Sequence, residues 1–353
     1  MYNNILEVNL NKFKDNISAI KKLTSKEIMP VVKAHAYSTY LDSRLDILNM
    51  FNIIAVARTT EAINIRKIGY QKDIFILNQP SIDEIELINK YNFIVGVSSK
   101  DFLNKINKKI RIHLEIETGM NRTGINLNDL NDIISIVENN KNIIVEGMYT
   151  HFSKADSDKE YTEYQINNFK KAYNLLKDKF NLKYIHSSAS SGILFYNDEI
   201  SNLIRPGLIL YGYYPNEEAK NIIKLQPITK FKSKIIFIKE LPPGEMISYG
   251  GTYITKNNTK VATIPIGYAD GINRLLSNRG SVIIKGKKCP IIGSICMDSL
   301  MVDITGLNVE ENDTVVLFDN EIITVEEIAK LCNTINYEVL TNISDRVKRV
   351  FVE

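Results

Sequence analysis

From residue 11 to about 215, short apolar runs rich in β-branched residues alternate with longer segments of helical spacing. The segment TTEAINIRKIG, for example, has apolar residues at helical spacing and ends at Gly69; these residues are Ala62, Ile63, Ile65 and Ile68. Strand–helix alternation repeated about eight times predicts a parallel sheet, and eight units in ~200 residues favour a (β/α)8 barrel over an open sheet. The predicted strands are residues 28–34, 53–57, 73–77, 93–97, 111–117, 143–152, 184–188 and 203–212.

The alternation of strands and helices ends at about residue 225, and the pattern beyond it is that of short strands separated by turns. This pattern predicts a mostly antiparallel β domain. We therefore assign residues 1–225 to the barrel and residues 226–353 to a C-terminal, mostly β domain. The stretches that support the second domain are residues 231–241, 242–254, 260–271, 280–293 and 313–318.

Composition narrows the class of protein. The 353 residues include 44 Lys and Arg against 41 Asp and Glu, and the two signs are interspersed, which argues against nucleic-acid binding. No apolar run approaches the ~20 residues of a membrane span. The first ten residues, MYNNILEVNL, lack the pattern of a secretory signal. Three cysteines without metal-site spacing suit reduced thiols, so we expect a cytoplasmic protein.

Candidate chemistry lies at the C-terminal ends of the predicted strands, because these ends face the active site of a barrel. Lys33 ends the first strand, and three of the four histidines fall on the later strands. The candidates are Lys33, His113, Glu115, Glu117, Arg122, His151, His186, Ser190, Arg205 and Gly207.

Two mechanisms can use these residues. In the first, Lys33 forms a Schiff base with an aldehyde cofactor, and the cations Arg122 and Arg205 favour its neutral, nucleophilic amine. The turn at Gly207 then offers backbone N–H groups to a phosphate. In the second, His113, Glu115, His151 and His186 hold a divalent metal, as in metal-dependent barrel hydrolases.

Neither mechanism is decided by these residues alone. The metal site would need ligands from the early strands, and the first strand offers a lysine. A lone lysine at a strand end is more often a solvated surface residue. A lone histidine there is more often a hydrogen-bonded residue of the core or rim than a ligand.

The stretch VVKAHAYSTY, residues 31–40, resembles the pyridoxal-phosphate (PLP) attachment motif of alanine racemases, V-V-K-A-N-A-Y-G-H-G. Seven further segments match in the expected order, so the chain resembles the alanine racemase family of fold type III. These are IETGMNRTG (116–124), EGMYTHFSKAD (146–156), IRPGLILYG (204–212), ISYGGTY (247–253), IPIGYADG (264–271), GSICMDSLMVDI (293–304) and TINYEV (334–339).

The resemblance implies a two-base mechanism in a homodimer. Lys33 would hold the cofactor as a Schiff base and act on one face of the substrate α-carbon. Tyr249, supplied by the C-terminal domain of the partner subunit, would act on the opposite face. Racemisation requires both, because one base removes the proton and the other replaces it. The family activates this tyrosine through His151, with Arg205 behind it.

The other roles follow from the same resemblance. Arg205 would face the pyridine nitrogen of PLP and leave it unprotonated, which weakens the cofactor as an electron sink. Arg122 would hydrogen-bond the phenolic oxygen of PLP. Tyr268 would line the path of the substrate, and Met297 of the partner would help to receive its carboxylate. The phosphate would be held by Tyr37, Ser190 and the backbone of Gly207 and Leu208.

The chain departs from the family pattern at three places. The loop after Lys33 carries non-family residues at positions 35, 38, 39 and 40. Glu115 stands where many relatives have a lysine that becomes carbamylated, and we expect it to orient Arg122 directly. Asp345 replaces a tyrosine that narrows the substrate pocket, and we expect it to turn toward the substrate or to pair with Arg346 or Arg349.

We therefore predict a cytoplasmic, homodimeric, PLP-dependent alanine racemase that supplies D-alanine for peptidoglycan and binds no metal, nucleic acid or membrane. Because Asp345 would make the pocket roomier and more polar, a serine or mixed alanine/serine racemase is the alternative. A surface Asp345 would leave specificity unchanged. A metal-dependent barrel hydrolase is a more remote alternative. The second domain argues against a PLP carrier. A PLP decarboxylase of the same fold type stays open in principle, but the matches ISYGGTY and GYADG resemble racemases.

Overall fold

The computed structural model describes residues 4–353. The chain divides into two compact units, which are described here separately. The barrel unit consists of Asp15–Ala36 and Tyr40–Gln226. The C-terminal unit consists of Pro227–Glu353 together with Tyr37–Thr39 and the residues up to Lys14.

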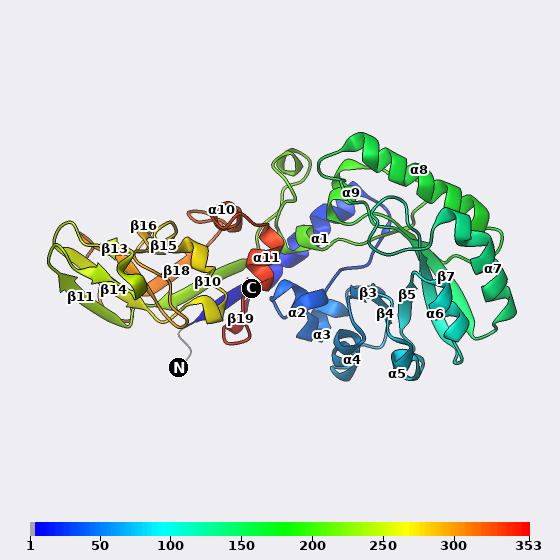
Figure 1. The fold of residues 1–353 in the computed structure, drawn as a ribbon, viewed down its shortest axis with the longest axis horizontal. Helices are drawn as coiled ribbons and strands as arrows, with labels where there is room; N and C mark the ends of the chain where they lie inside the picture. Colours follow the sequence, from blue (N-terminus) through cyan, green and yellow to red (C-terminus); the bar gives the residue numbers. More distant parts are fainter. Residues whose placement is uncertain (1–3) are drawn as a thin grey trace. The chain divides into compact units, whose positions relative to one another are not determined.

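Short parallel strands form the barrel unit (Figure 1). Six of them pair in the order β3-β4-β5-β6-β7-β8, and β2 pairs with β9. The Val32 N–H donates to Ala55 O at 2.8 Å and the Arg205 N–H donates to Ser188 O at 2.9 Å, which joins the pair to both edges of the six-stranded sheet. The (β/α)8 barrel is thus confirmed. The strands are β2 (Glu27–Ile28), β3 (Ile53–Val56), β4 (Asp73–Ile76), β5 (Ile94–Val97), β6 (Ile110–Glu115), β7 (Ile143–Tyr149), β8 (Tyr184–His186) and β9 (Leu203–Ile204).

Helices α4 to α8 lie outside the strands (Figure 1). In α4 the apolar face predicted from the sequence buries Ala62 and Ile65, and Gly69 follows the helix with a φ of 105°, a conformation that glycine adopts without strain. The helices are α1 (Leu10–Leu23), α2 (Lys33–Tyr37), α3 (Leu45–Leu48), α4 (Thr59–Lys67), α5 (Ile85–Tyr91), α6 (Lys100–Lys105), α7 (Leu130–Asn139), α8 (Lys159–Leu176) and α9 (Ser190–Phe195).

The first and last barrel strands are much shorter than the apolar runs 28–34 and 203–212 suggest. β2 ends at Ile28, and the chain enters a left-handed turn at Lys33. β9 ends at Ile204, before Pro206 removes a backbone donor from the ladder. A 3-10 turn, Leu208–Tyr211, then follows.

The C-terminal unit contains a six-stranded sheet in the order β16-β15-β18-β10-β1-β19, a three-stranded sheet β11-β14-β17 and a hairpin β12-β13. All pairs are antiparallel except β1 with β19, so the mostly antiparallel β domain is confirmed. The elements are β10 (Thr229–Lys234), β11 (Phe237–Leu241), β12 (Met246–Ile247), β13 (Tyr253–Ile254), β14 (Thr259–Ile264), β15 (Ser281–Ile284), β16 (Lys287–Pro290), β17 (Leu300–Asp303), β18 (Thr314–Phe318), α10 (Val325–Leu331), α11 (Asn336–Thr341) and β19 (Lys348–Val352).

The N-terminal strand β1 (Ile5–Asn9) pairs with β10 and β19 of the C-terminal unit, whereas the sequence assigned residues 1–225 to the barrel. Its burial alternates, with Leu6 and Val8 fully buried and their neighbours partly exposed. This period of two suits a sheet with one solvated face, whereas barrel strands are buried on both faces.

Among residues 4–353, no helix combines the length and the hydropathy that a membrane span requires.

Candidate active site

Lys33 begins a turn of left-handed backbone. The φ angles of Ala34, His35 and Ala36 are 53°, 51° and 52°. Left-handed backbone costs about 1–2 kcal/mol for each residue other than glycine, so the surrounding structure must hold the turn. The Ala36 N–H donates to Val32 O at 2.9 Å and closes it.

The non-family residues keep this loop left-handed. Ser38 and Tyr40 have φ angles of 61° and 60°, although the family motif has glycine at both positions. The His35 ring stacks on the Tyr40 ring at 4.6 Å, and His35 Nδ1 lies 3.5 Å from the Asp42 carboxylate. These contacts offset part of the strain that glycine would have avoided.

The amine of Lys33 has a pKa below its usual value. Burial is the largest cause, and the Arg122 guanidinium is the next. Arg205 lowers the pKa further, and the Glu61 carboxylate opposes the shift. A lowered pKa raises the fraction of lysine that is present as the neutral, nucleophilic amine, the form that attacks an aldehyde to make an imine.

Arg205 is 2% exposed and binds backbone carbonyls and histidines. Its Nη1 donates to His186 Nδ1 at 2.7 Å and to His186 O at 2.8 Å. Its Nη2 donates to Thr150 O at 2.7 Å and to Ser187 O at 3.0 Å, and lies 3.4 Å from His151 Nδ1. Burial lowers the pKa of Arg205 to about 10, so the guanidinium stays charged at neutral pH.

A chain of two buried histidines extends from Arg205. Because His186 Nδ1 accepts from Arg205, His186 Nε2 carries the proton and donates to His113 Nδ1 at 2.8 Å. Burial lowers the pKa of His113 to about 3 and the pKa of His186 well below its usual value, so both rings are neutral. The sequence suggested these histidines either as metal ligands or as hydrogen-bonded core residues, and it did not reveal their link to Arg205.

The metal alternative is not favoured by this geometry. Both ring nitrogens of His186 already have hydrogen-bond partners, one of them the Arg205 cation. In the part of the chain that the structure describes, no three His, Cys, Asp or Glu side chains are grouped so as to hold a metal ion.

The buried histidines predict acid sensitivity. Their folded-state pKa values lie below the unfolded value of about 6.5, so the unfolded chain binds more protons and stability falls as the pH falls below 6.5. His151, whose pKa burial also lowers to about 3, adds to this effect, so for three histidines the loss between pH 6.5 and 5.5 is about 3 kcal/mol. Urea unfolding of the apo-protein across this range measures it.

The matched variant for this prediction is His113→Asn, whose amide oxygen can still accept from His186. We expect it to reduce the slope of stability against pH by about a third, because His186 and His151 keep their lowered pKa values. An unchanged slope would mean that His113 does not account for the acid sensitivity.

His151 and Arg122 lie on the same barrel unit as Lys33 and Arg205. Burial lowers the pKa of His151 to about 3, helped by the charges of Arg205 and Arg122. Its Nδ1 faces Arg205, which leaves Nε2 to carry the proton of the neutral ring. Arg122 itself is exposed and makes no hydrogen bond or ion pair with the described residues.

Glu115 does not bind Arg122, contrary to our expectation. Its Oε1 accepts the Thr123 hydroxyl at 2.9 Å, so the carboxylate holds the residue next to Arg122 while the arginine side chain is exposed. Glu117, another candidate from the sequence, accepts the Asn121 N–H at 2.9 Å. Glu117 therefore fixes the backbone of the loop that carries Arg122, and Glu115 fixes the Thr123 side chain of the same loop.

The loop after β9 offers donors for a phosphate. The N–H groups of Gly207 and Ile209 point at Ser190 Oγ, at 3.3 and 3.4 Å, and Leu208 lies buried between them. Such converging backbone donors suit a phosphate group. Together with Lys33 and Arg205, these residues fit PLP. Tyr37, which belongs to the C-terminal unit, is buried beside Tyr337, and burial raises its pKa, so its hydroxyl keeps its proton.

Tyr249 lies on the C-terminal unit and is 73% exposed. The preceding Ser248 has φ 63° and ψ −174°, a region that residues other than glycine rarely occupy. Its hydroxyl donates to Ser294 O at 2.6 Å, and the Ser294 hydroxyl donates to Tyr249 O at 2.9 Å. These two hydrogen bonds thus hold the strained backbone around Tyr249, whose ring is exposed to solvent.

Met297 and Tyr249 line the same depression of about 480 Å³. Tyr268 is tied to this loop, because its N–H donates to Cys296 O at 3.1 Å. Gly267 permits the contact, since a Cβ at this position would lie 2.3 Å from the Cys296 and Met297 carbonyl oxygens. Three predicted site residues of the C-terminal unit therefore occupy neighbouring loops.

Asp345 is exposed and borders the Tyr268 loop. The adjacent Ser344 hydroxyl donates to Ala269 O at 2.7 Å. Arg346, one of the two arginines that the sequence offered as a partner of Asp345, binds Asp298 at 2.6 Å and lies 3.6 Å from Asp270. Arg349 donates to backbone carbonyl groups, among them that of Ser344 at 2.6 Å.

Two family models cover most of the chain. The model described as alanine racemase, N-terminal domain, matches residues 8–215, and the model described as alanine racemase, C-terminal domain, matches residues 228–351. The alanine racemase of Clostridium novyi (strain NT) is 38% identical over 372 residues, covering 98% of this chain and 95% of the relative. Alanine racemase 1 of Clostridium acetobutylicum is 39% identical over 368 residues, with the same coverage.

Solved structures agree with the sequence relatives. Alanine racemase of Clostridium difficile 630 has a TM-score of 0.94 and 37% identity, covering 100% of this chain and 96% of that chain. The Bacillus anthracis alanine racemase with bound L-Ala-P also has a TM-score of 0.94, at 30% identity and with the same coverage. Because both domains match over nearly their full length, the chain belongs to the alanine racemase family.

Proposed function

We propose that this protein is a PLP-dependent racemase that interconverts L- and D-alanine. The observation that carries the proposal is the half-buried Lys33 amine, whose pKa is lowered by burial and by Arg122 and Arg205, at the mouth of a barrel that also offers phosphate donors. Relatives named alanine racemase cover 98% of the chain and support the substrate.

When bound, PLP would withdraw the electron pair left on the substrate α-carbon after proton removal. The chain supplies the proton transfers. Lys33 Nζ would exchange the α-proton on one face, and Tyr249 Oη would exchange it on the opposite face. His151 and Arg205 would orient the tyrosine hydroxyl, and Arg205, which only donates hydrogen bonds, would leave the ring nitrogen of the cofactor unprotonated.

We further propose a homodimer in which each C-terminal unit completes the site of the other subunit. The exposed ring of Tyr249 is accompanied by exposed apolar side chains, with Met246 70%, Ile254 48% and Met297 52% exposed. A patch of this kind is typical of a surface that another protein covers. The partner's Met297 would then help to bind the substrate carboxylate, and Tyr268 would line the path by which the substrate enters.

The remaining cofactor contacts are those that the resemblance to the family implies. Arg122 would bind the phenolic oxygen of PLP. Ser190 and the backbone of Gly207 and Leu208 would bind its phosphate, and Tyr37 would donate its retained proton to the same group. We expect a cytoplasmic enzyme that supplies D-alanine for peptidoglycan.

Borohydride reduction of the purified holoenzyme, followed by peptide mass mapping, tests the cofactor assignment. The expected result is a reduced pyridoxyl group on Lys33. Label on another lysine would overturn the role of Lys33. The absence of label together with metal-dependent hydrolysis would restore the hydrolase alternative.

The substrate is tested by kcat/KM for L-alanine and L-serine on the same preparation. We expect a preference for alanine of at least about tenfold, because an apolar pocket built for a methyl group gains little from a larger side chain. Asp345 is exposed, so Asp345→Tyr should change the ratio by less than about threefold. Equal values, or a serine preference that Asp345→Tyr abolishes, would instead support a serine or mixed racemase.

A further inference from the structure

Glu61, in the first turn of α4, directs its carboxylate at the turn that begins at Lys33. Its Oε1 accepts the Ala34 N–H at 2.7 Å. Its Oε2 accepts the N–H groups of Ala57 at 2.8 Å and of Arg58 at 3.0 Å. One side chain therefore connects the segment after β2 to the loop after β3.

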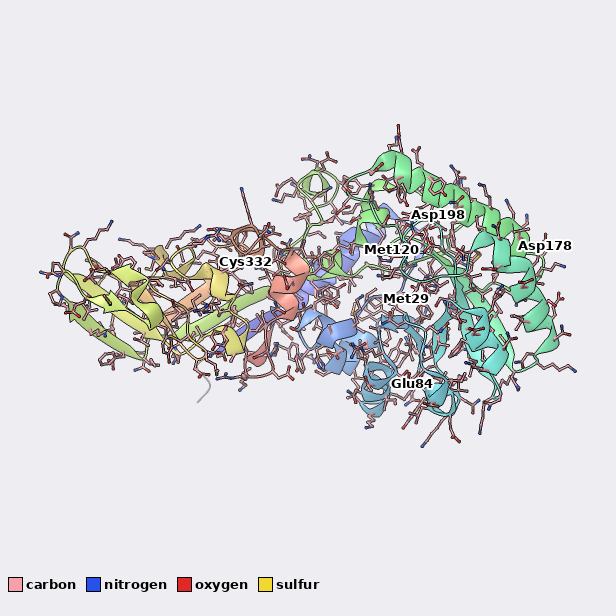
Figure 2. The ribbon with its side chains drawn as sticks, in the orientation of Figure 1. Met29, Glu84, Met120, Asp178, Asp198 and Cys332 are labelled. Carbon is pink, nitrogen blue, oxygen red and sulfur yellow. The ribbon has the colours of Figure 1, made fainter. Side chains whose placement is uncertain are left out.

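The bond to Ala34 has a particular consequence for Lys33. The Ala34 N–H belongs to the peptide group that immediately follows Lys33, so fixing it fixes the backbone on the C-terminal side of the lysine. Ala34 has a left-handed φ of 53°, which needs external support in an L-residue. The Val32 N–H, bound to Ala55 O at 2.8 Å, anchors the other side. Figure 2 labels Met29, through which the chain leaves β2 toward this turn.

Glu61 also acts on Lys33 through charge. The charged groups that face the amine are Arg122, Arg205 and Glu61. The two arginines favour the neutral amine, and the carboxylate favours the ammonium form. Glu61 in turn faces the buried carboxylate of Asp42. Removing the negative charge of Glu61 should therefore shift the titration of Lys33 to lower pH.

We propose that Glu61 is a positioning residue for Lys33: its carboxylate locks the left-handed turn and thereby fixes the direction of the lysine side chain. The inference rests on the proposed role of Lys33 as the cofactor lysine. It assigns to the start of α4 a function that the sequence did not suggest, since a glutamate in the first turn of a helix ordinarily serves as a cap.

Glu84 provides the matched control. It occupies the first turn of the helical segment leading into α5, and its Oε2 accepts the Ser81 N–H at 2.7 Å in a capping box. Figure 2 labels it on the same barrel unit. Glu84→Gln thus weakens a helix cap of the same kind without touching the turn at Lys33.

The first measurement is amide hydrogen exchange of the apo-protein in the peptide covering residues 32–40. We expect Glu61→Ala and Glu61→Gln to accelerate this exchange at least about tenfold, and Glu84→Gln to leave it unchanged. Glu61→Asp keeps the charge, but its carboxylate is too short to reach both loops, so it should accelerate exchange as well. Unchanged exchange in Glu61→Ala, or equal acceleration in Glu84→Gln, would overturn the proposal.

The second measurement is the pH dependence of Lys33 labelling by PLP and borohydride. Glu61→Gln should shift the labelling profile to lower pH than in the wild type, and Glu61→Asp should restore most of the wild-type profile. A Glu61→Gln profile that coincides with the wild type would overturn the inference while the cofactor assignment stands. Failure to label Lys33 in the wild type would overturn the cofactor assignment, and the exchange result would still decide whether Glu61 holds the turn.

Discussion

Mixing the Lys33→Ala and Tyr249→Phe variants is expected to restore about a quarter of the wild-type activity once subunits exchange. Each variant alone should lose at least about three orders of magnitude in kcat, because each lacks one of the two proton-transfer groups. The recovery follows from sharing of sites. Half of the dimers become hybrids at random exchange, and each hybrid combines an intact lysine from one subunit with an intact tyrosine from the other.

The control is the double variant Lys33→Ala/Tyr249→Phe mixed with an equal amount of wild type. If Tyr249 serves the partner's lysine, every hybrid has two damaged sites, and activity falls from about half to about a quarter of that of an all-wild-type sample during exchange. If both residues act within one subunit, activity stays at about half and the first mixture recovers nothing. Subunit exchange is verified with differently tagged chains.

Arg205→Ala is expected to lower the free energy of unfolding of the apo-protein by about 3–5 kcal/mol. The substitution leaves the buried carbonyl oxygens of Thr150, His186 and Ser187 without the guanidinium donors and opens a cavity beside the histidine chain. Each unpaired buried acceptor costs about 1–3 kcal/mol, although water that enters the cavity reduces the total. Urea unfolding of the apo-protein measures the difference.

Arg274→Ala is the control for this prediction, because Arg274 lies exposed on a 3-10 turn. It should change stability by less than about 0.5 kcal/mol. A loss below about 1 kcal/mol for Arg205→Ala would show that solvent replaces the guanidinium donors. Arg205 would then serve only the cofactor and would not stabilise the barrel.

Much of the fold follows from local pattern. All eight apolar runs predicted as barrel strands overlap a strand, although the run 28–34 does so only at Ile28, because an apolar run between amphipathic segments is buried wherever it lies in a parallel barrel. The C-terminal antiparallel domain could also be predicted, since its short strands are separated by turns that the local sequence indicates. The motif around Lys33, together with seven further segments that match in the expected order, was sufficient to identify the family, because the order of residues along the chain is itself a sequence property.

The backbone conformation around the candidate active site could not be predicted from the sequence. The run 28–34 reads as one strand, yet Lys33 begins a left-handed turn, because the sign of φ at an alanine leaves no trace in the pattern of apolar and polar residues. Glu115 was expected to bind Arg122, but its carboxylate reaches the Thr123 hydroxyl instead. Whether the Arg122 or the Thr123 side chain reaches Glu115 depends on the conformation of the loop that carries both residues.

The amino-acid sequence by itself determined the barrel, the C-terminal β domain, the family and the candidate residues, since each is encoded in residues that are neighbours or follow a short period. Only the tertiary structure decided which partners those residues have. It brings His186 to Arg205, Glu61 to the peptide after Lys33, and β1 to β10 and β19. These contacts join segments that are distant in the chain, and a hydrogen bond requires a geometry of distance and angle that only the folded chain supplies.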